Sequence, residues 1–132
     1  MKNCILYSRV DEKFGFDNTT INVQLARLQR FASSNQLEVI SAIRGYEPGI
    51  MTDRASLRLL RHEIADKKPD AVVVVSLDRL SKSARDLRSL IAEFRSNGVE
   101  LISLKEGNCT GVFSPVRRSQ PLLSERRGGA LA

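Results

Sequence analysis

The feature that most constrains the fold is an unbroken apolar run at Ala71-Val72-Val73-Val74-Val75, which a dense polar segment follows at once. Four consecutive valines without polar alternation are typical of a central strand that is covered on both faces, as in a parallel sheet. Residues 78 to 85 then hold one acid, three bases and two hydroxyl side chains. Because open α/β sheets bind ligands beyond the carboxyl ends of their strands, we expect the functional site in this segment.

Strand and helix patterns alternate on either side of this run. Strands are expected over residues 3–10, 37–46, 70–77 and 99–104, and helices over 21–35, 53–68 and 83–97. This alternation predicts an α/β fold with an open, mainly parallel sheet of four to five strands and helices on both faces. The length of 132 residues suits a single domain.

Beyond Lys105 the periodic pattern dissolves into segments that are broken by Gly and Pro. We therefore expect a folded domain over residues 1–106 and a basic, flexible tail over 107–132. Residues 112–132 hold four arginines against one glutamate, and the whole chain carries a formal net charge of +6. This balance favours a polyanionic partner, but it is a weak signal by itself.

The two cysteines, Cys4 and Cys109, are too few for the disulfide framework of a small secreted protein. Neither a signal peptide nor an apolar stretch of about 18 residues is visible. The sequence therefore predicts a soluble cytoplasmic protein with reduced thiols and no membrane partner.

If the parallel strands end at one edge of the sheet, that edge gathers basic side chains from distant segments. Arg9, Arg54, Arg79 and Lys82 all follow or flank expected strands. A guanidinium group can donate two parallel hydrogen bonds to two oxygens of one phosphate, and it stays charged at any working pH. Such a cluster suits a phosphodiester and its more highly charged transition state.

Five short sequence motifs occur in a distinctive order along the chain. They are Tyr7-Ser8-Arg9-Val10-Asp11, Gln24-Leu25-Ala26-Arg27-Leu28, Gly49-Ile50 with Asp53-Arg54, Ser76-Leu77-Asp78-Arg79-Leu80-Ser81-Lys82-Ser83, and Gly98-Val99-Glu100-Leu101. In order and spacing they resemble the N-terminal catalytic domain of the serine site-specific recombinases, the resolvases and invertases. The resemblance covers residues 4–106, and its most specific part is Asp-Arg-Leu-Ser. The fold that it implies agrees with the one predicted above.

The resemblance implies DNA recombination or integration of the kind that transposons and phages use. In that family a serine attacks the DNA phosphate, and arginines stabilise the transferring group without a metal or other cofactor. The implied partners are DNA and other recombinase subunits, either in a homo-oligomer (dimer or tetramer) or in a hetero-oligomer with an intact recombinase. By motif position the implied site residues are Arg9, Arg54 and Arg79 as active-site arginines, Gln24, Asp78 as an orienting acid, Tyr7 as a phosphate contact, and Lys82 in place of a further arginine.

The most serious departure from the family pattern is Asp11, which stands where the nucleophilic serine is expected. Glu47 also replaces the aspartate that commonly precedes the Gly-Ile pair, and the turn after it is shorter than usual. A carboxylate about 4 Å from a phosphate anion is repelled by about 4 kcal/mol at an effective dielectric constant of about 20. If Asp11 did attack, the product would be an acyl phosphate, which water cleaves readily. The first hypothesis is therefore a recombinase-like domain that binds DNA phosphate and is deficient in strand cleavage.

Two alternatives stay open from the sequence. The domain is an active recombinase or nickase that uses Ser8 or Asp11, although strand alternation turns Ser8 away from Tyr7 and Arg9. Alternatively, acids at the strand ends hold Mg²⁺ or a phosphoryl group in a receiver-like α/β domain. These residues are Asp11, Glu12, Glu47 and Asp78, together with Lys105. The nearby arginines argue against this last hypothesis, since fixed positive charge would oppose a bound cation.

Overall fold

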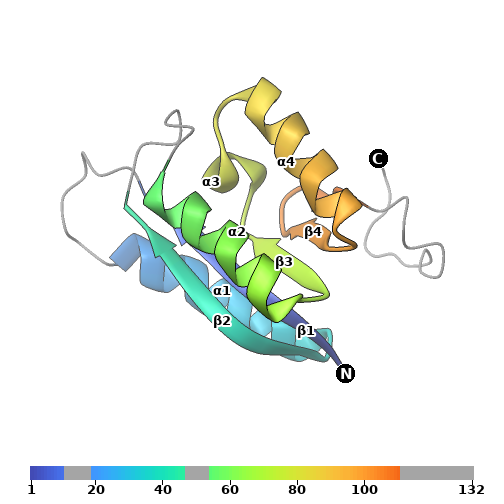
Figure 1. The fold of residues 1–132 in the computed structure, drawn as a ribbon. Helices are drawn as coiled ribbons and strands as arrows, with labels where there is room; N and C mark the ends of the chain where they lie inside the picture. Colours follow the sequence, from blue (N-terminus) through green and yellow to red (C-terminus); the bar gives the residue numbers. More distant parts are fainter. Residues whose placement is uncertain (11–18, 47–53, 111–132) are drawn as a thin grey trace.

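The computed structural model describes residues 1–10, 19–46 and 54–110 of the chain (Figure 1). Strands and helices alternate along these ranges, as the sequence pattern predicts. The elements are β1 (Lys2–Arg9), α1 (Thr19–Ser34), β2 (Leu37–Gly45), α2 (Ala55–Lys67), β3 (Ala71–Val74), α3 (Leu77–Leu80), α4 (Ala84–Ser96), β4 (Glu100–Ser103) and β5 (Gly107–Asn108).

The five strands form one sheet in the order β2-β1-β3-β4-β5. The pairs β1–β2, β1–β3 and β3–β4 are parallel, whereas β4 and β5 are antiparallel. In the register between the two central strands, Cys4 lies opposite Ala71 and Leu6 opposite Val73. The predicted α/β class with an open, mainly parallel sheet is confirmed.

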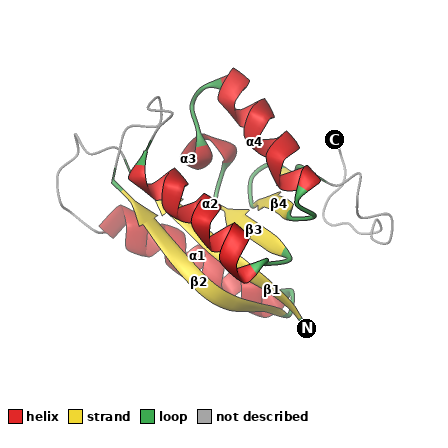
Figure 2. Ribbon diagram, viewed as in Figure 1, coloured by secondary structure: helices red, strands yellow, loops and turns green. Residues whose placement is uncertain are grey.

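Helices cover both faces of this sheet, with α1 on one side and α2 and α4 on the other (Figure 2). The valine run supplies both layers of the core, since Val73 packs with α1 while Val72 and Val74 pack beneath α2 and α4. All three side chains are fully buried. The absence of polar alternation in this strand therefore reflects burial on both faces.

The helices α2 and α4 are followed by residues with a positive φ. At the end of α2, Lys68 adopts a left-handed backbone (φ 47°) and its N–H donates to Ile64 O at 2.9 Å, directly before Pro69. After α4, Gly98 has a φ of 70°, a conformation that favours glycine because it has no Cβ. At the start of α4, the Ser83 hydroxyl accepts a hydrogen bond from the N–H of Asp86 at 3.2 Å and so caps the helix.

Most predicted boundaries lie within two residues of the observed ones, but two differ by more. The central strand ends at Val74, and Leu77, which was expected to belong to it, opens the short helix α3. The domain also continues past residue 106, because β5 pairs with β4 and the hydroxyl of the buried Thr110 accepts a hydrogen bond from Leu101 N at 3.0 Å. Residues 107 and 108 are therefore part of the sheet and Thr110 is bonded to β4, whereas the rest of the expected tail, residues 111–132, lies outside the described residues.

Cys4 is buried, Cys109 is partly buried, and both are free thiols. In the described ranges, no helix is both long and apolar enough to cross a membrane.

Candidate functional site

The candidate site lies where β1 and β3 end and where the four-residue helix α3 packs against both strands (Figure 1). The structure brings together side chains from β1, α1, the start of α2 and α3 itself. They are Tyr7, Arg9, Gln24, Arg54, Asp78 and Arg79. Asp11, the expected nucleophile position, lies outside the described residues.

Arg9 is fully buried at the end of β1 and points toward α3. Its Nε donates to the carbonyl of Arg79 at 2.7 Å, and its Nη2 donates to the carbonyl of Asp78 at 2.6 Å. In return, Nη1 of Arg79 donates to the carbonyl of Arg9 at 3.0 Å. The two arginines therefore join the end of β1 to α3 through reciprocal side chain to backbone hydrogen bonds.

Arg54 reaches the same helix from the residue before α2, and its side chain is only 1% exposed. Its Nη2 donates to the carbonyl of Leu80 at 2.5 Å and to the hydroxyl of Tyr7 at 2.9 Å. The Tyr7 hydroxyl also lies 2.8 Å from the Ser56 hydroxyl, and both residues are buried. Tyr7 thus links β1 to the start of α2.

The carbonyls that Arg9 and Arg54 contact belong to the last residues of α3. The last carbonyls of a helix have no partner within the helix, and the partial negative charge there favours a cation. Two guanidinium groups therefore satisfy and neutralise this end of α3.

Gln24 on α1 holds the backbone at the end of β1. Its Oε1 accepts from the N–H of Arg9 at 3.2 Å, and its Nε2 donates to the carbonyl of Arg9 at 3.0 Å. Gln24 is 5% exposed, so these bonds are shielded from water. Position 11 follows two residues after Arg9 in the sequence.

Asp78 and Arg79 are the more exposed members of the cluster, with side chains 55% and 31% exposed, and Arg79 Nε lies 3.9 Å from Asp78 Oδ1. The Ser76 hydroxyl donates to the Asp78 carboxylate. This hydrogen bond, aided by the charges of Arg79, Arg9 and Lys105, holds the pKa of Asp78 below its ordinary value. Asp78 is therefore an anion at neutral pH.

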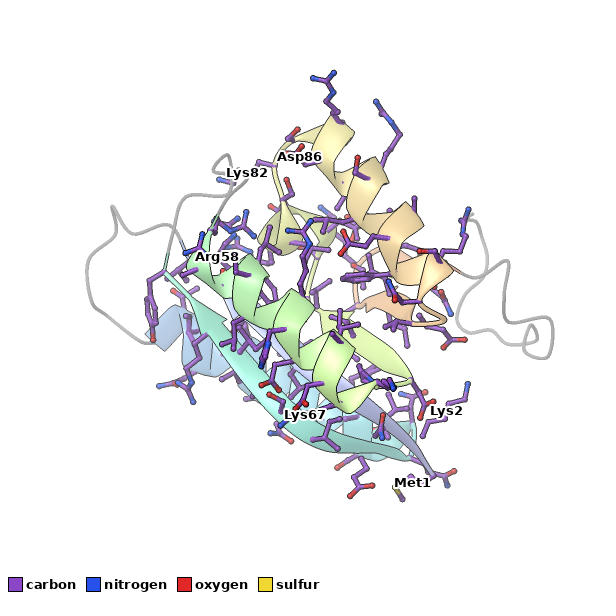
Figure 3. All side chains as sticks on the ribbon, viewed as in Figure 1. Met1, Lys2, Arg58, Lys67, Lys82 and Asp86 are labelled. Carbon is purple, nitrogen blue, oxygen red and sulfur yellow. The ribbon has the colours of Figure 1, made fainter. Side chains whose placement is uncertain are left out.

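Lys82 lies just beyond α3 and is exposed. Figure 3 shows it near Asp86 at the start of α4, on the side of the molecule away from Met1 and Lys2. A cation at this position is therefore accessible to a large anionic partner.

Ser8 occupies the opposite face of β1 from Tyr7 and Arg9. It is fully buried, and its hydroxyl donates to the carbonyl of Ile43 in β2 at 3.0 Å. The predicted alternation along the strand is confirmed, and this hydroxyl is directed into the sheet.

Sequence reasoning did not identify two residues that contact the cluster, Ser56 and Glu106. Ser56 bonds to Tyr7, and the Glu106 carboxylate accepts a hydrogen bond from the N–H of Leu77, the first residue of α3, at 3.1 Å. No motif marks either one, because each contact joins residues that are 49 or 29 positions apart.

A family model described as "Resolvase, N terminal domain" matches residues 4–120. The N-terminal catalytic domain of TP901-1 integrase is 32% identical, with a TM-score of 0.70, and the match covers 79% of this chain and 78% of that one. A resolvase family site-specific recombinase from Streptococcus pneumoniae shares the fold at 22% identity and a TM-score of 0.67, covering 88% of this chain and 85% of its own. No curated protein matches the sequence.

Proposed function

The chain belongs to the resolvase family of serine recombinases through its catalytic domain, and on that premise we propose that it binds DNA phosphate without cleaving the strand. One observation carries the proposal. The arginine framework around α3 is assembled, whereas the position expected for the attacking serine holds Asp11. A site that keeps the positively charged arginines but lacks the nucleophilic serine is suited to binding DNA phosphate rather than to strand transfer.

Arg79 and Lys82 are the proposed phosphate contacts, since both are at least partly exposed. Arg9 and Arg54 are proposed to act through α3, because their guanidinium groups donate to its carbonyls. Their fixed charges still raise the local positive potential, and this effect is stronger in a poorly solvated site than in water.

Asp11 opposes cleavage in two ways. Its carboxylate lacks the hydroxyl that would form a stable phosphoester bond, and its charge repels the phosphate. A repulsion of about 4 kcal/mol corresponds to roughly a thousandfold loss in the rate of attack. An acyl phosphate, if formed, would be lost to water before the strand could be rejoined.

A covalent-trapping assay tests this proposal. The parent and the variants Asp11→Ser and Asp11→Ala are incubated with supercoiled DNA that carries candidate sites, quenched with detergent and examined for protein-linked DNA. We expect an adduct from Asp11→Ser alone, because only that variant supplies a hydroxyl. The alanine variant is the matched control, since it removes the repulsion without adding a nucleophile.

An adduct from the parent would overturn the proposed cleavage deficiency. If none of the three proteins forms protein-linked DNA although all of them bind DNA at low salt, the idea that the rest of the site is functional would be refuted. DNA binding by Arg79→Ala is measured across a range of salt concentrations. If Arg79 contacts a phosphate, the variant should bind DNA more weakly and its affinity should depend less steeply on salt.

Ser8 is a poor substitute nucleophile, since it is buried and its hydroxyl donates to Ile43. The receiver-like hypothesis relied largely on acids that lie outside the described residues, and the Asp78 carboxylate is engaged by Ser76 and Arg79. The family assignment favours the recombinase interpretation over this alternative.

Serine recombinase domains act on DNA, generally as oligomers. We extend the proposal to the partners of this chain, which are DNA together with a second copy or an intact recombinase. In a mixed oligomer, a subunit that binds DNA but cannot cleave it would lower recombination by its active partner. The basic residues at 112–132 are proposed to add to the contact with DNA.

A further inference from the structure

The helix α3 is too short to hold its own position. It spans only Leu77–Leu80, and a single helical turn is unfavourable without outside contacts. Arg9 and Arg54 hold its carboxyl end, as described above. The N–H of Leu77, the first residue of α3, has a partner from a different part of the chain.

Glu106 provides that contact. Its Oε1 accepts from the N–H of Leu77 at 3.1 Å, across 29 residues of sequence. A free N–H at the start of a helix carries partial positive charge, so a carboxylate is a favourable partner. The contact therefore joins the connection between β4 and β5 to the first residue of α3.

Glu106 is itself held in place by Ser103, the last residue of β4. The Ser103 hydroxyl donates to the Glu106 carboxylate and accepts from the N–H groups of Lys105 and Glu106 at 3.2 and 3.1 Å. Ser103 is 1% exposed and pairs with Val74 at the end of β3. The position of the Glu106 carboxylate is thus fixed by a residue of the sheet, Ser103.

We propose that Glu106 is a positioning residue, which holds the start of α3 through the Leu77 amide so that Arg79 faces the DNA phosphate. The part of the inference that concerns DNA rests on the proposed function, whereas the control of α3 does not. Arg79 lies two residues after Leu77, so a displacement of the first residue of α3 moves the guanidinium as well.

Amide hydrogen exchange and the NMR signal of the Arg79 Nε–H test the first part without DNA. In Glu106→Ala we expect exchange of the Leu77 amide to rise about three- to tenfold, and the Arg79 signal to shift. Amides of β1 and β3 should be unaffected. Glu106→Gln keeps an acceptor oxygen and should restore most of the protection. Asn108→Ala is the matched control, because the hydrogen bonds described for the Asn108 side chain go to Thr110 and not to α3.

A double-mutant comparison on a DNA duplex tests the second part. We expect Glu106→Ala to weaken binding several-fold in the parent and to have little effect in the Arg79→Ala background, since the two residues act through one contact. Equal weakening in both backgrounds would overturn the positioning of Arg79. Unchanged Leu77 exchange in Glu106→Ala, or an equal change in Asn108→Ala, would overturn the inference outright.

The two proposals can fail separately. If the parent does not bind DNA, the proposed function fails, while the exchange and NMR measurements still decide whether Glu106 controls α3 and Arg79. If Glu106→Ala does not fold, Glu106→Asp replaces it, because its carboxylate is one methylene shorter and should not reach the Leu77 amide.

Discussion

Replacing Arg54 with alanine should destabilise the domain strongly, although the family resemblance presents this residue as part of an active site. The Arg54 side chain is 1% exposed, and its Nη2 donates to Leu80 O and to the Tyr7 hydroxyl. Hydrogen bonds from charged donors contribute about 1.5 to 3 kcal/mol each, and the desolvation of the guanidinium offsets part of this. We expect Arg54→Ala to lower the free energy of unfolding by about 3 to 5 kcal/mol, a large share of the stability of a small domain.

Urea unfolding followed by circular dichroism measures this loss. Arg54→Lys should recover only part of it, because one ammonium cannot reproduce the geometry of the guanidinium. Tyr7→Phe removes a single acceptor of Arg54 and should cost about 1 to 2 kcal/mol. Arg88→Ala, at an exposed position on α4, is the matched control and should change stability by no more than about 0.5 kcal/mol. A loss below about 1 kcal/mol in Arg54→Ala would refute the idea that this arginine supports α3.

Three further predictions follow from single groups. Ser8→Ala should lower the free energy of unfolding by about 1 kcal/mol through the lost bond to Ile43, and should leave adduct formation by the Asp11→Ser protein unchanged in the trapping assay. The pKa of Asp78 is depressed in the folded state, so its stabilisation is present above the ordinary value of 3.8 and is lost as the pH falls through the lower folded value. Asp78→Asn should therefore lose less stability than the parent over this acid range in urea unfolding, and a parallel pH profile would contradict the shift. Burial raises the pKa of Cys4 to about 11, and burial together with Glu106 raises that of Cys109 to about 12, so both thiols should react slowly with iodoacetamide at pH 8 unless urea is added.

The central sheet could be predicted because its signal is local. The valine run lacks polar alternation, and burial on both faces is the physical cause of that pattern, with Val73 on one side and Val72 and Val74 on the other. The helix α3 could not be predicted in this way. Four residues are too few to show a helical period, and the contacts that define it come from Glu106, Arg9 and Arg54, all distant in sequence.

Motif order predicts which described side chains lie together around α3, but it cannot predict how deeply each one is buried. Whether an arginine faces solvent or a carbonyl depends on where other elements pack, and neither spacing nor composition carries that information. Arg9 and Arg79 belong to the same cluster, yet one is fully buried and the other is 31% exposed along its side chain. The identity of Asp11 was evident from the sequence alone, since a substitution at a motif position needs no structure to be seen.

Because some of these arginines are buried and others are exposed, their presence in the sequence is not by itself strong evidence of catalytic activity. Arg9 and Arg54 satisfy the carbonyls of α3, and losing either would leave buried acceptors without donors at a cost in stability. A domain that no longer cleaved DNA would still need both residues to keep this helix in place. Their presence is therefore weak support for catalysis, whereas a hydroxyl at position 11 would be strong support. For this reason the comparison of Asp11→Ser with Asp11→Ala is more informative about activity than the removal of any arginine.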